Sequence, residues 1–300
     1  MFLRNPFAKL GGAARDNMPP PFDPAPVKSR DATPASRPSD WLARSTARHV
    51  RLVTYNVHGC IGTDGRMSET RIGDVLAEID ADVIVLQELD VGRRRSSRGH
   101  QPEKIALQLN MSFLFCPSVR DGDEHYGHAV MSRLPLHLVQ SEELPRTFWP
   151  KATEPRSALW AELEGPARLQ LIATHLGLSP LERRRQARAL VSARWMGDPR
   201  FKGPRVFCGD LNVGPWSLTY RQLRGSMRDA HREVAGFRAR PTFPSRMPML
   251  RLDHVFASDD VKIEGAHVPV SALSRVASDH LPLAVDLAFA PVATNADQQA

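Results

Sequence analysis

The chain has 300 residues, of which 42% are apolar, and this is enough to bury a sizeable core in one large domain or two small ones. No window approaches the roughly 20 apolar residues of a membrane span, and the first residues are too interrupted for a secretory signal, so we expect no transmembrane segment. The net charge of +7 admits nucleic acid as a partner, but residues 1–48 carry eight Lys/Arg against four Asp/Glu and supply +4 of it.

Three regions differ in composition. Residues 1–48 hold eight of the 25 prolines and show no apolar periodicity, which predicts a disordered tail. Residues 49–290 carry strand and helix patterns throughout, so we expect one folded domain there. Residues 291–300 are polar and predict a frayed C-terminal tail.

The folded region opens with two strand candidates. Residues 49–57 are rich in β-branched side chains, and residues 81–89 form a continuous apolar run typical of a strand covered on both faces. Between them apolar residues recur at helical spacing, at Ile72, Val75, Leu76 and Ile79. Short helices are predicted near residues 104–110 and 217–223. Further strands are predicted at residues 128–133, 157–163, 168–176, 205–210, 252–258, 261–268 and 281–289.

One longer helix has a clear start signal. Ser179 at the N-cap, Pro180 at the first helical position and Glu182 at the third form a capping box, and the helix is predicted to run to about Met196. Many strands with intermittent helices favour an α/β layered fold. The irregular order argues against a simple Rossmann or barrel alternation.

The cysteines indicate the redox environment. The chain has three cysteines, Cys60, Cys116 and Cys208, an odd number without the spacing of metal ligands. Cys208 lies in an apolar run, which is typical of a core residue. We therefore expect no disulfides and a reducing, cytoplasmic location.

Polar residues gather where the predicted strands begin or end. Each alone could cap a turn or lie in the core, but so many at strand ends are better explained by one shared site. They are Asn56 with His58, Gln87 with Glu88, His175, Asp210 with Asn212, Asp253 with His254, and Asp279 with His280.

These residue types fit one chemistry. Carboxylates with a carboxamide are hard oxygen ligands that suit Mg²⁺ or Mn²⁺, whereas zinc would need more closely spaced His and Cys. A Walker A lysine loop and a GxSxG elbow are both absent from the sequence. A divalent metal with histidines then points to hydrolysis of a phosphate ester by a deprotonated water.

The motifs TYNVHG, LQELD, THLG, GDLNVGP, RLDHVF and SDHLPL resemble, in that order, those of the endonuclease/exonuclease/phosphatase superfamily, as in bacterial stand-alone members. The resemblance spans roughly residues 49–289. It implies a four-layer α/β sandwich, in which two packed mixed β-sheets are flanked by helices. Its members include nucleases, sphingomyelinases and inositol-polyphosphate phosphatases.

The same resemblance implies roles for individual residues. Asn56, Glu88 and Asp279 look like metal ligands. His280 looks like the general base that activates a water for in-line attack, and Asp253 would orient it.

Other motif residues would act on the water and the phosphate. Asp210 would position or help deprotonate the attacking water, and Asn212 and His175 would donate hydrogen bonds to the phosphate. Further contacts to phosphate or substrate are implied at Arg156, His58 and His128. His128 stands where the family commonly has asparagine, and His58 where apurinic endonucleases carry an aspartate.

Substrate identity stays open between nucleic acid and phospholipid. Arginine runs at residues 93–98 and 183–188 suit nucleic acid or a solvated face, whereas apolar loop residues at 146–150 and 242–250 suit contact with a membrane surface. We expect a monomeric phosphodiesterase. The alternatives are a phosphomonoesterase acting on inositol phosphates or lipids, and a catalytically silent binding protein on the same fold.

Overall fold

The computed structural model describes residues 49–147, 153–165, 167–225, 227–234 and 239–289. The predicted tails, residues 1–48 and 291–300, lie outside the described residues. Among the described residues, no helix has the length and apolar character needed to cross a membrane.

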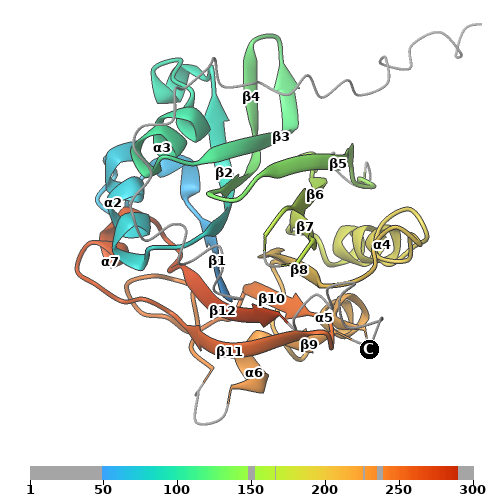
Figure 1. Cartoon of the computed structure of the whole chain (residues 1–300). Coiled ribbons are helices and arrows are strands. Elements are labelled where there is room, and N and C mark those ends of the chain that lie inside the picture. Colours follow the sequence, from blue (N-terminus) through green and yellow to red (C-terminus); the bar gives the residue numbers. More distant parts are fainter. Residues whose placement is uncertain (1–48, 148–152, 166, 226, 235–238, 290–300) are drawn as a thin grey trace, which may run out of the picture.

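Two six-stranded sheets form the centre of the molecule (Figure 1). The first sheet runs in the order β11 (Val261–His267), β12 (Leu283–Phe289), β1 (His49–Asn56), β2 (Val83–Val91), β4 (Glu124–Ser132) and β3 (Ser112–Asp121). The second sheet runs in the order β5 (Leu136–Glu143), β6 (Ser157–Leu163), β7 (Leu169–His175), β8 (Arg205–Asp210), β10 (Asp253–Ala257) and β9 (Arg228–Asp229). Both sheets are mixed, because β1 pairs parallel with β2 and β7 pairs parallel with β8, while the other pairs are antiparallel.

Helices cover the outer face of each sheet. In Figure 1, α2 (Glu69–Ile79), α3 (Gln101–Leu109) and α7 (Ser274–Ala277) lie on the side of the first sheet, and α4 (Pro180–Leu190) and α5 (Leu218–Arg224) lie on the side of the second. The short α6 (Ala230–Glu233) follows β9. This arrangement is the four-layer α/β sandwich that the sequence motifs implied.

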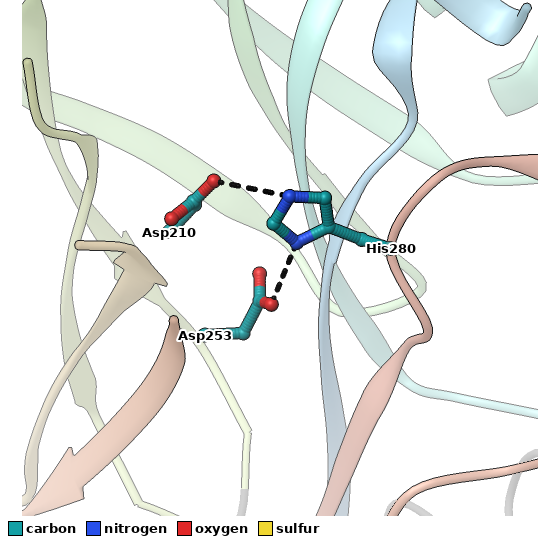
Figure 2. A group of neighbouring side chains, drawn as sticks. All are labelled: Asp210, Asp253 and His280. Atoms are coloured by element: carbon teal, nitrogen blue, oxygen red, sulfur yellow. Dashed lines mark hydrogen bonds and ion pairs between the residues drawn. The ribbon is translucent and has the colours of Figure 1, made fainter. Parts of the chain in front are cut away.

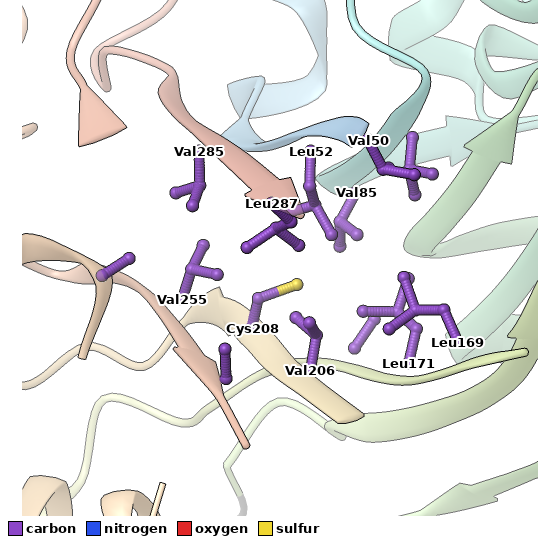
Figure 3. Close-up of a cluster of buried hydrophobic side chains, with 14 of the residues drawn as sticks. Val50, Leu52, Val85, Leu169, Leu171, Val206, Cys208, Val255, Val285 and Leu287 are labelled. Atoms are coloured by element: carbon purple, nitrogen blue, oxygen red, sulfur yellow. The ribbon is translucent and has the colours of Figure 1, made fainter. Parts of the chain in front are cut away.

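The central core lies between the two sheets. Leu52 and Val85 of the first sheet face Leu171, Val206 and Cys208 of the second, all of them buried (Figure 3). Alternation of side chains along each strand places a second set of apolar residues on the outer faces, under the helices. The helical spacing read from residues 72–79 is confirmed, since all four of those apolar side chains are buried.

The cysteine prediction agrees with this core. Cys60, Cys116 and Cys208 are all free and buried. Cys208 belongs to the cluster between the sheets, where it acts as a small apolar side chain.

Helix α4 departs from its predicted form. It starts at Pro180 as expected, but Ser179 makes no capping hydrogen bond through its side chain, and the helix ends at Leu190 rather than near Met196. The Ser192 hydroxyl donates to the Ala189 carbonyl at 2.6 Å, and this local bond competes with continuation of the helix. The chain then turns through residues 191–200.

Strands β3 and β5 were not predicted, because their sequences lack a clean alternation. Both lie at the edges of their sheets, where fewer side chains are buried. In β3, Pro117 coincides with a shift in the pairing register, which is where proline is tolerated within a strand.

The topology brings several strand ends to one edge of the sandwich. The carboxyl ends of the parallel strands β1 and β2 lie there in the first sheet, and those of β7 and β8 in the second. β10 and β12 run antiparallel to β8 and β1, so both strands start at the same edge. The polar residues that were predicted to gather therefore lie at this one edge of the sandwich.

Candidate active site

The first polar group lies where β1 and β2 end. Asn56 is buried at the end of β1, and its amide nitrogen donates to Glu88 Oε1 at 2.9 Å and to Asp210 Oδ2 at 2.9 Å. Glu88 sits in a bulge of β2 between Leu86 and Leu89, with φ of 63°. Such a left-handed backbone costs a non-glycine residue on the order of 1–3 kcal/mol, and here it aims the carboxylate at Asn56.

Asp210 lies at the centre of the site. It ends β8 and is buried, and its Oδ1 accepts from the Asn212 backbone nitrogen at 2.9 Å. The preceding Gly209 allows β8 to approach β7 closely, because a Cβ at this position would lie 1.9 Å from the Thr174 carbonyl oxygen. Asp210 Oδ2 then faces Asn56 and two histidines.

His175 is one of these two histidines, at the end of β7. Its Nε2 lies 3.5 Å from Asp210 Oδ2 and 4.0 Å from Glu88 Oε1, and its Nδ1 lies 3.2 Å from Arg156 Nη1. Arg156 Nη1 and the Asn212 amide nitrogen, which lies 3.1 Å from Nε2, are both donors, so a neutral imidazole can accept from only one of them. Burial and the Arg156 charge both lower the pKa of His175 well below its usual value, which keeps the ring neutral.

His280 is the second histidine, just before β12. Its Nδ1 contacts Asp253 Oδ2 at 2.9 Å, and its Nε2 faces Asp210 Oδ2 at 3.7 Å (Figure 2). A carboxylate only accepts, so Asp253 fixes the Nδ1–H tautomer and leaves Nε2 free to take a proton. The geometry is that of a base held by an orienting acid.

The charges around His280 favour its protonated form. Burial alone would lower the pKa of His280, but the carboxylates of Asp253 and Asp210 outweigh it and raise the pKa to about 10. Burial in turn raises the pKa of Asp210 to about 6, against the opposing effect of His280. Without a metal ion the ring would therefore already carry a proton at neutral pH, and a cation bound among the same carboxylates would oppose this effect and favour the neutral ring that a base requires.

Asp279 and His58 form the more open side of the site. The Asp279 side chain is 37% exposed, and its Oδ1 lies 4.0 Å from His58 Nδ1. His58 in turn donates from its backbone nitrogen to Asn56 Oδ1 at 3.1 Å. The Ser278 hydroxyl donates to the Asn56 carbonyl oxygen at 2.8 Å, which ties the Asp279 segment to the end of β1.

Two sets of side chains could hold a metal ion. Asn56, Glu88 and Asp279 are hard oxygen donors around the open side of the site, which fits a small divalent cation. Within the described residues, Asp210, Asp253 and His280 also offer ligand atoms that all lie within 4.8 Å of one another. We favour the first set, because a metal bound to His280 Nε2 would occupy the ring nitrogen that faces Asp210.

Of three further predicted contacts, two lie deeper than a substrate would reach directly. Arg156 is 5% exposed and bonds Glu154 Oε1 at 2.9 Å, so it acts on the site through His175. His128 is buried on β4, beside the Arg156 charge and the Ala173 backbone. Asn212 is half-buried, and its amide nitrogen donates to the Leu176 carbonyl at 2.9 Å and lies 3.1 Å from His175 Nε2.

Two residues from the strand-end pattern point elsewhere. His254 follows Asp253 on β10 and therefore faces the opposite side of the sheet, where its Nε2 contacts the Val213 carbonyl at 2.9 Å. Gln87 lies in the same bulge as Glu88, but its amide nitrogen donates to the Thr54 hydroxyl at 3.0 Å in the interior. Both support the site from behind.

Two supporting residues were missed in the sequence. The Thr242 hydroxyl donates to Asp253 Oδ2 at 2.6 Å, and the Phe243 ring packs on His280 with centroids 4.8 Å apart. They lie ten or more residues before Asp253 of the RLDH motif. Only the proximity of the segment TFPSRMP to that motif could have indicated them.

Comparison with known proteins finds relatives of the whole sandwich. The sequence profile described as Endonuclease/Exonuclease/phosphatase family matches residues 53–280. The chain is 24% identical over 253 residues to the uncharacterized protein YbhP of Escherichia coli K12, a match that covers 79% of this chain and 95% of YbhP.

Solved structures share the fold. The endonuclease/exonuclease/phosphatase from Beutenbergia cavernae superposes with a TM-score of 0.65 at 25% identity, over 81% of this chain and 72% of that one. A second enzyme of that description, from Bacteroides vulgatus, gives a TM-score of 0.64 at 18% identity, over 81% and 99% of the two chains.

Proposed function

The chain belongs to the endonuclease/exonuclease/phosphatase family, and from this premise we propose that it is a divalent-metal-dependent hydrolase of phosphodiesters. The observation that carries the proposal is the buried triad of Asp253, His280 and Asp210, in which His280 Nε2 faces the second carboxylate. A base held in this way can take a proton from a water that lies between it and a phosphorus atom.

His280 would activate the attacking water. Asp253 holds the ring and stabilises the imidazolium that forms, as the orienting acid does in other acid–histidine pairs. Asp210, with its Oδ2 facing the same space, would orient the water toward the phosphorus for in-line attack.

The phosphate would be bound from the β7 and β8 side. In the tautomer that accepts from Arg156 at Nδ1, His175 would carry its proton on Nε2, on the ring edge that faces Asp210 and Glu88, and would donate it to a phosphoryl oxygen. The Asn212 amide lies beside that nitrogen and supplies a second donor. Arg156 would favour this tautomer by donating to His175 Nδ1 from the side away from the phosphate.

The metal would be held by Asn56, Glu88 and Asp279. When bound, a divalent ion such as Mg²⁺ or Mn²⁺ offsets charge on the phosphoryl oxygens. The oxygen donors, the exposure of Asp279 and the bulge that turns Glu88 inward support this assignment.

The charge of the site favours a diester over a monoester. Glu88, Asp210, Asp253 and Asp279 surround the reaction centre, and Arg156 is the guanidinium that contacts a site residue directly, through His175. A phosphodiester carries one negative charge, whereas a phosphomonoester carries close to two at neutral pH and would meet stronger repulsion. The filled ligand and base positions also argue against a silent binding protein.

A soluble substrate tests the proposal directly. The purified protein should hydrolyse bis-p-nitrophenyl phosphate with Mg²⁺ or Mn²⁺, faster than p-nitrophenyl phosphate, and excess EDTA should abolish the reaction. Glu88→Gln should weaken metal activation, while Asp64→Asn, which removes an exposed carboxylate outside the site, serves as the matched control. Undiminished turnover in EDTA would exclude the metal, and preference for the monoester would favour a phosphomonoesterase.

The extent and location of the enzyme complete the proposal. We place the catalytic domain at residues 49–290, with the flanking segments outside the chemistry. The free, buried cysteines support a cytoplasmic location.

A further inference from the structure

Three segments leave the edge of the sandwich that carries the site. One follows His175 at the end of β7, and one follows Asp210 at the end of β8. The third leads into Asp253 at the start of β10, which pairs with Asp210. Their outer residues therefore surround the mouth of the proposed active site.

The first two segments expose large apolar side chains. After β7, Leu178 is 73% exposed and Leu181, at the start of α4, is 52% exposed. After β8, Trp216 is 70% exposed and Leu218, at the start of α5, is 63% exposed. Helices α4 and α5 pack against each other, so these two segments adjoin.

The third segment is a hairpin over residues 242–250. Phe243 and Leu250 pair at its base, and the Phe243 ring rests on His280. Between these two residues, Met247 is 66% exposed and Met249 is 64% exposed. Arg246, near the middle of the hairpin, donates to the Thr63 hydroxyl at 3.0 Å, which fixes the hairpin against the loop after β1.

The concentration of these side chains at one edge is unusual. Among the described residues, nine large apolar side chains are exposed, and seven of them lie on these three segments. The remaining two are Leu107 on α3 and Val270 before α7. Clustered apolar exposure on a protein surface marks a site of contact with another apolar surface.

The exposed charges on the two helices of this apolar rim, α4 and α5, have one sign. Arg184, Arg185 and Arg188 are exposed on α4, and Arg221 is exposed on α5. The acidic residue of α4, Glu182, is fully buried, and α5 contains no acidic residue. Apolar side chains beside exposed arginines match a surface of anionic lipids.

We propose that this rim inserts into the surface of an anionic phospholipid membrane and presents lipid phosphodiesters to the active site. The inference deepens the proposed function and depends on it for the chemistry, though not for the binding. A single-stranded nucleic acid would also meet the arginines, but it would require stacking partners. Of the seven exposed side chains only Trp216 is aromatic, and leucine and methionine suit acyl chains instead.

Vesicle sedimentation in EDTA tests the binding without turnover. The full chain should sediment with vesicles of phosphatidylglycerol and phosphatidylcholine, and less with phosphatidylcholine alone. The double variant Met247→Ser/Met249→Ser should lower the vesicle partition coefficient by about tenfold, because two side chains would no longer enter the acyl region. Leu107→Ser, an equally exposed side chain outside the rim, should leave it unchanged.

Hydrolysis of bis-p-nitrophenyl phosphate by the same proteins separates the two proposals. The rim variants should keep the wild-type rate on this soluble substrate. Vesicle binding that is absent, or that falls equally in Leu107→Ser, would overturn the membrane inference in a protein that cleaves the soluble diester. Loss of single-stranded oligonucleotide binding in Trp216→Ala, without any vesicle binding, would assign the rim to nucleic acid. Vesicle binding without cleavage of the soluble diester would instead refute the proposed chemistry.

Discussion

Replacement of His128 by asparagine should make the fold more tolerant of acid. His128 is buried on β4, and burial lowers its pKa from 6.5 to about 4, with the nearby Arg156 charge acting in the same direction. In the unfolded chain the imidazole regains a pKa of about 6.5. Asparagine carries no proton in either state, and the related motif commonly has it at this position.

The sign and size of the effect follow from these two values. Between about pH 4 and pH 6.5 the unfolded chain binds a proton that the folded chain does not, so His128 makes stability fall as pH falls through this window. From pH 7 to pH 5 the linkage removes about 2 kcal/mol from the free energy of unfolding. The variant lacks this loss.

Urea unfolding at pH 5, 6 and 7 measures the difference. The buried Trp160 and Trp195 supply a fluorescence signal for unfolding. Between pH 7 and pH 5 the free energy of unfolding of the wild type should fall by about 2 kcal/mol more than that of His128→Asn. The contributions of the other histidines cancel in this comparison. His137→Asn, which removes an exposed histidine from β5, is the control. Parallel pH dependence in the wild type and the His128 variant would refute the argument.

Three further predictions concern the site and its frame. His280→Ala should cut kcat by about 10²–10⁴-fold with little change in substrate binding, because the base acts in the transition state; near-normal turnover would remove it from the mechanism. Gly209→Ala should destabilise the fold by about 3 kcal/mol or more in urea unfolding, since the new Cβ would meet the Thr174 carbonyl oxygen at 1.9 Å, and an unchanged midpoint would contradict this. A chain reduced to residues 49–300 should keep its rate on the soluble diester, and a folded but inactive product would show that residues 1–48 take part.

The parts predicted well from the sequence were those that local patterns encode. Helical spacing located α2, and apolar runs located the strands of the sandwich centre. The motif order also placed Asp210, Asp253 and His280 at strand ends, and the structure brings these three side chains together.

Other features depend on contacts between distant segments. The backbone of Glu88 is left-handed because the pairing of β2 with β4 shifts register there. The motif LQELD does not predict that shift. Thr242 reaches Asp253 only once the hairpin has folded back. The end of α4 depends on the Ser192 hydroxyl, which bonds a backbone carbonyl of the last turn. The apolar rim depends on which side chains stay exposed once the chain has folded.

The site joins the two sheets, and this has a consequence for how the enzyme would fail. Asn56 and His280 come from the first sheet, and their partners Asp210 and Asp253 come from the second. Neither sheet alone carries all the groups that the proposed reaction needs. The packing between the sheets, through buried residues such as Leu52 and Val206, therefore sets the distances between these groups. A perturbation of the core should therefore abolish activity as soon as the two sheets shift relative to each other, before either sheet unfolds.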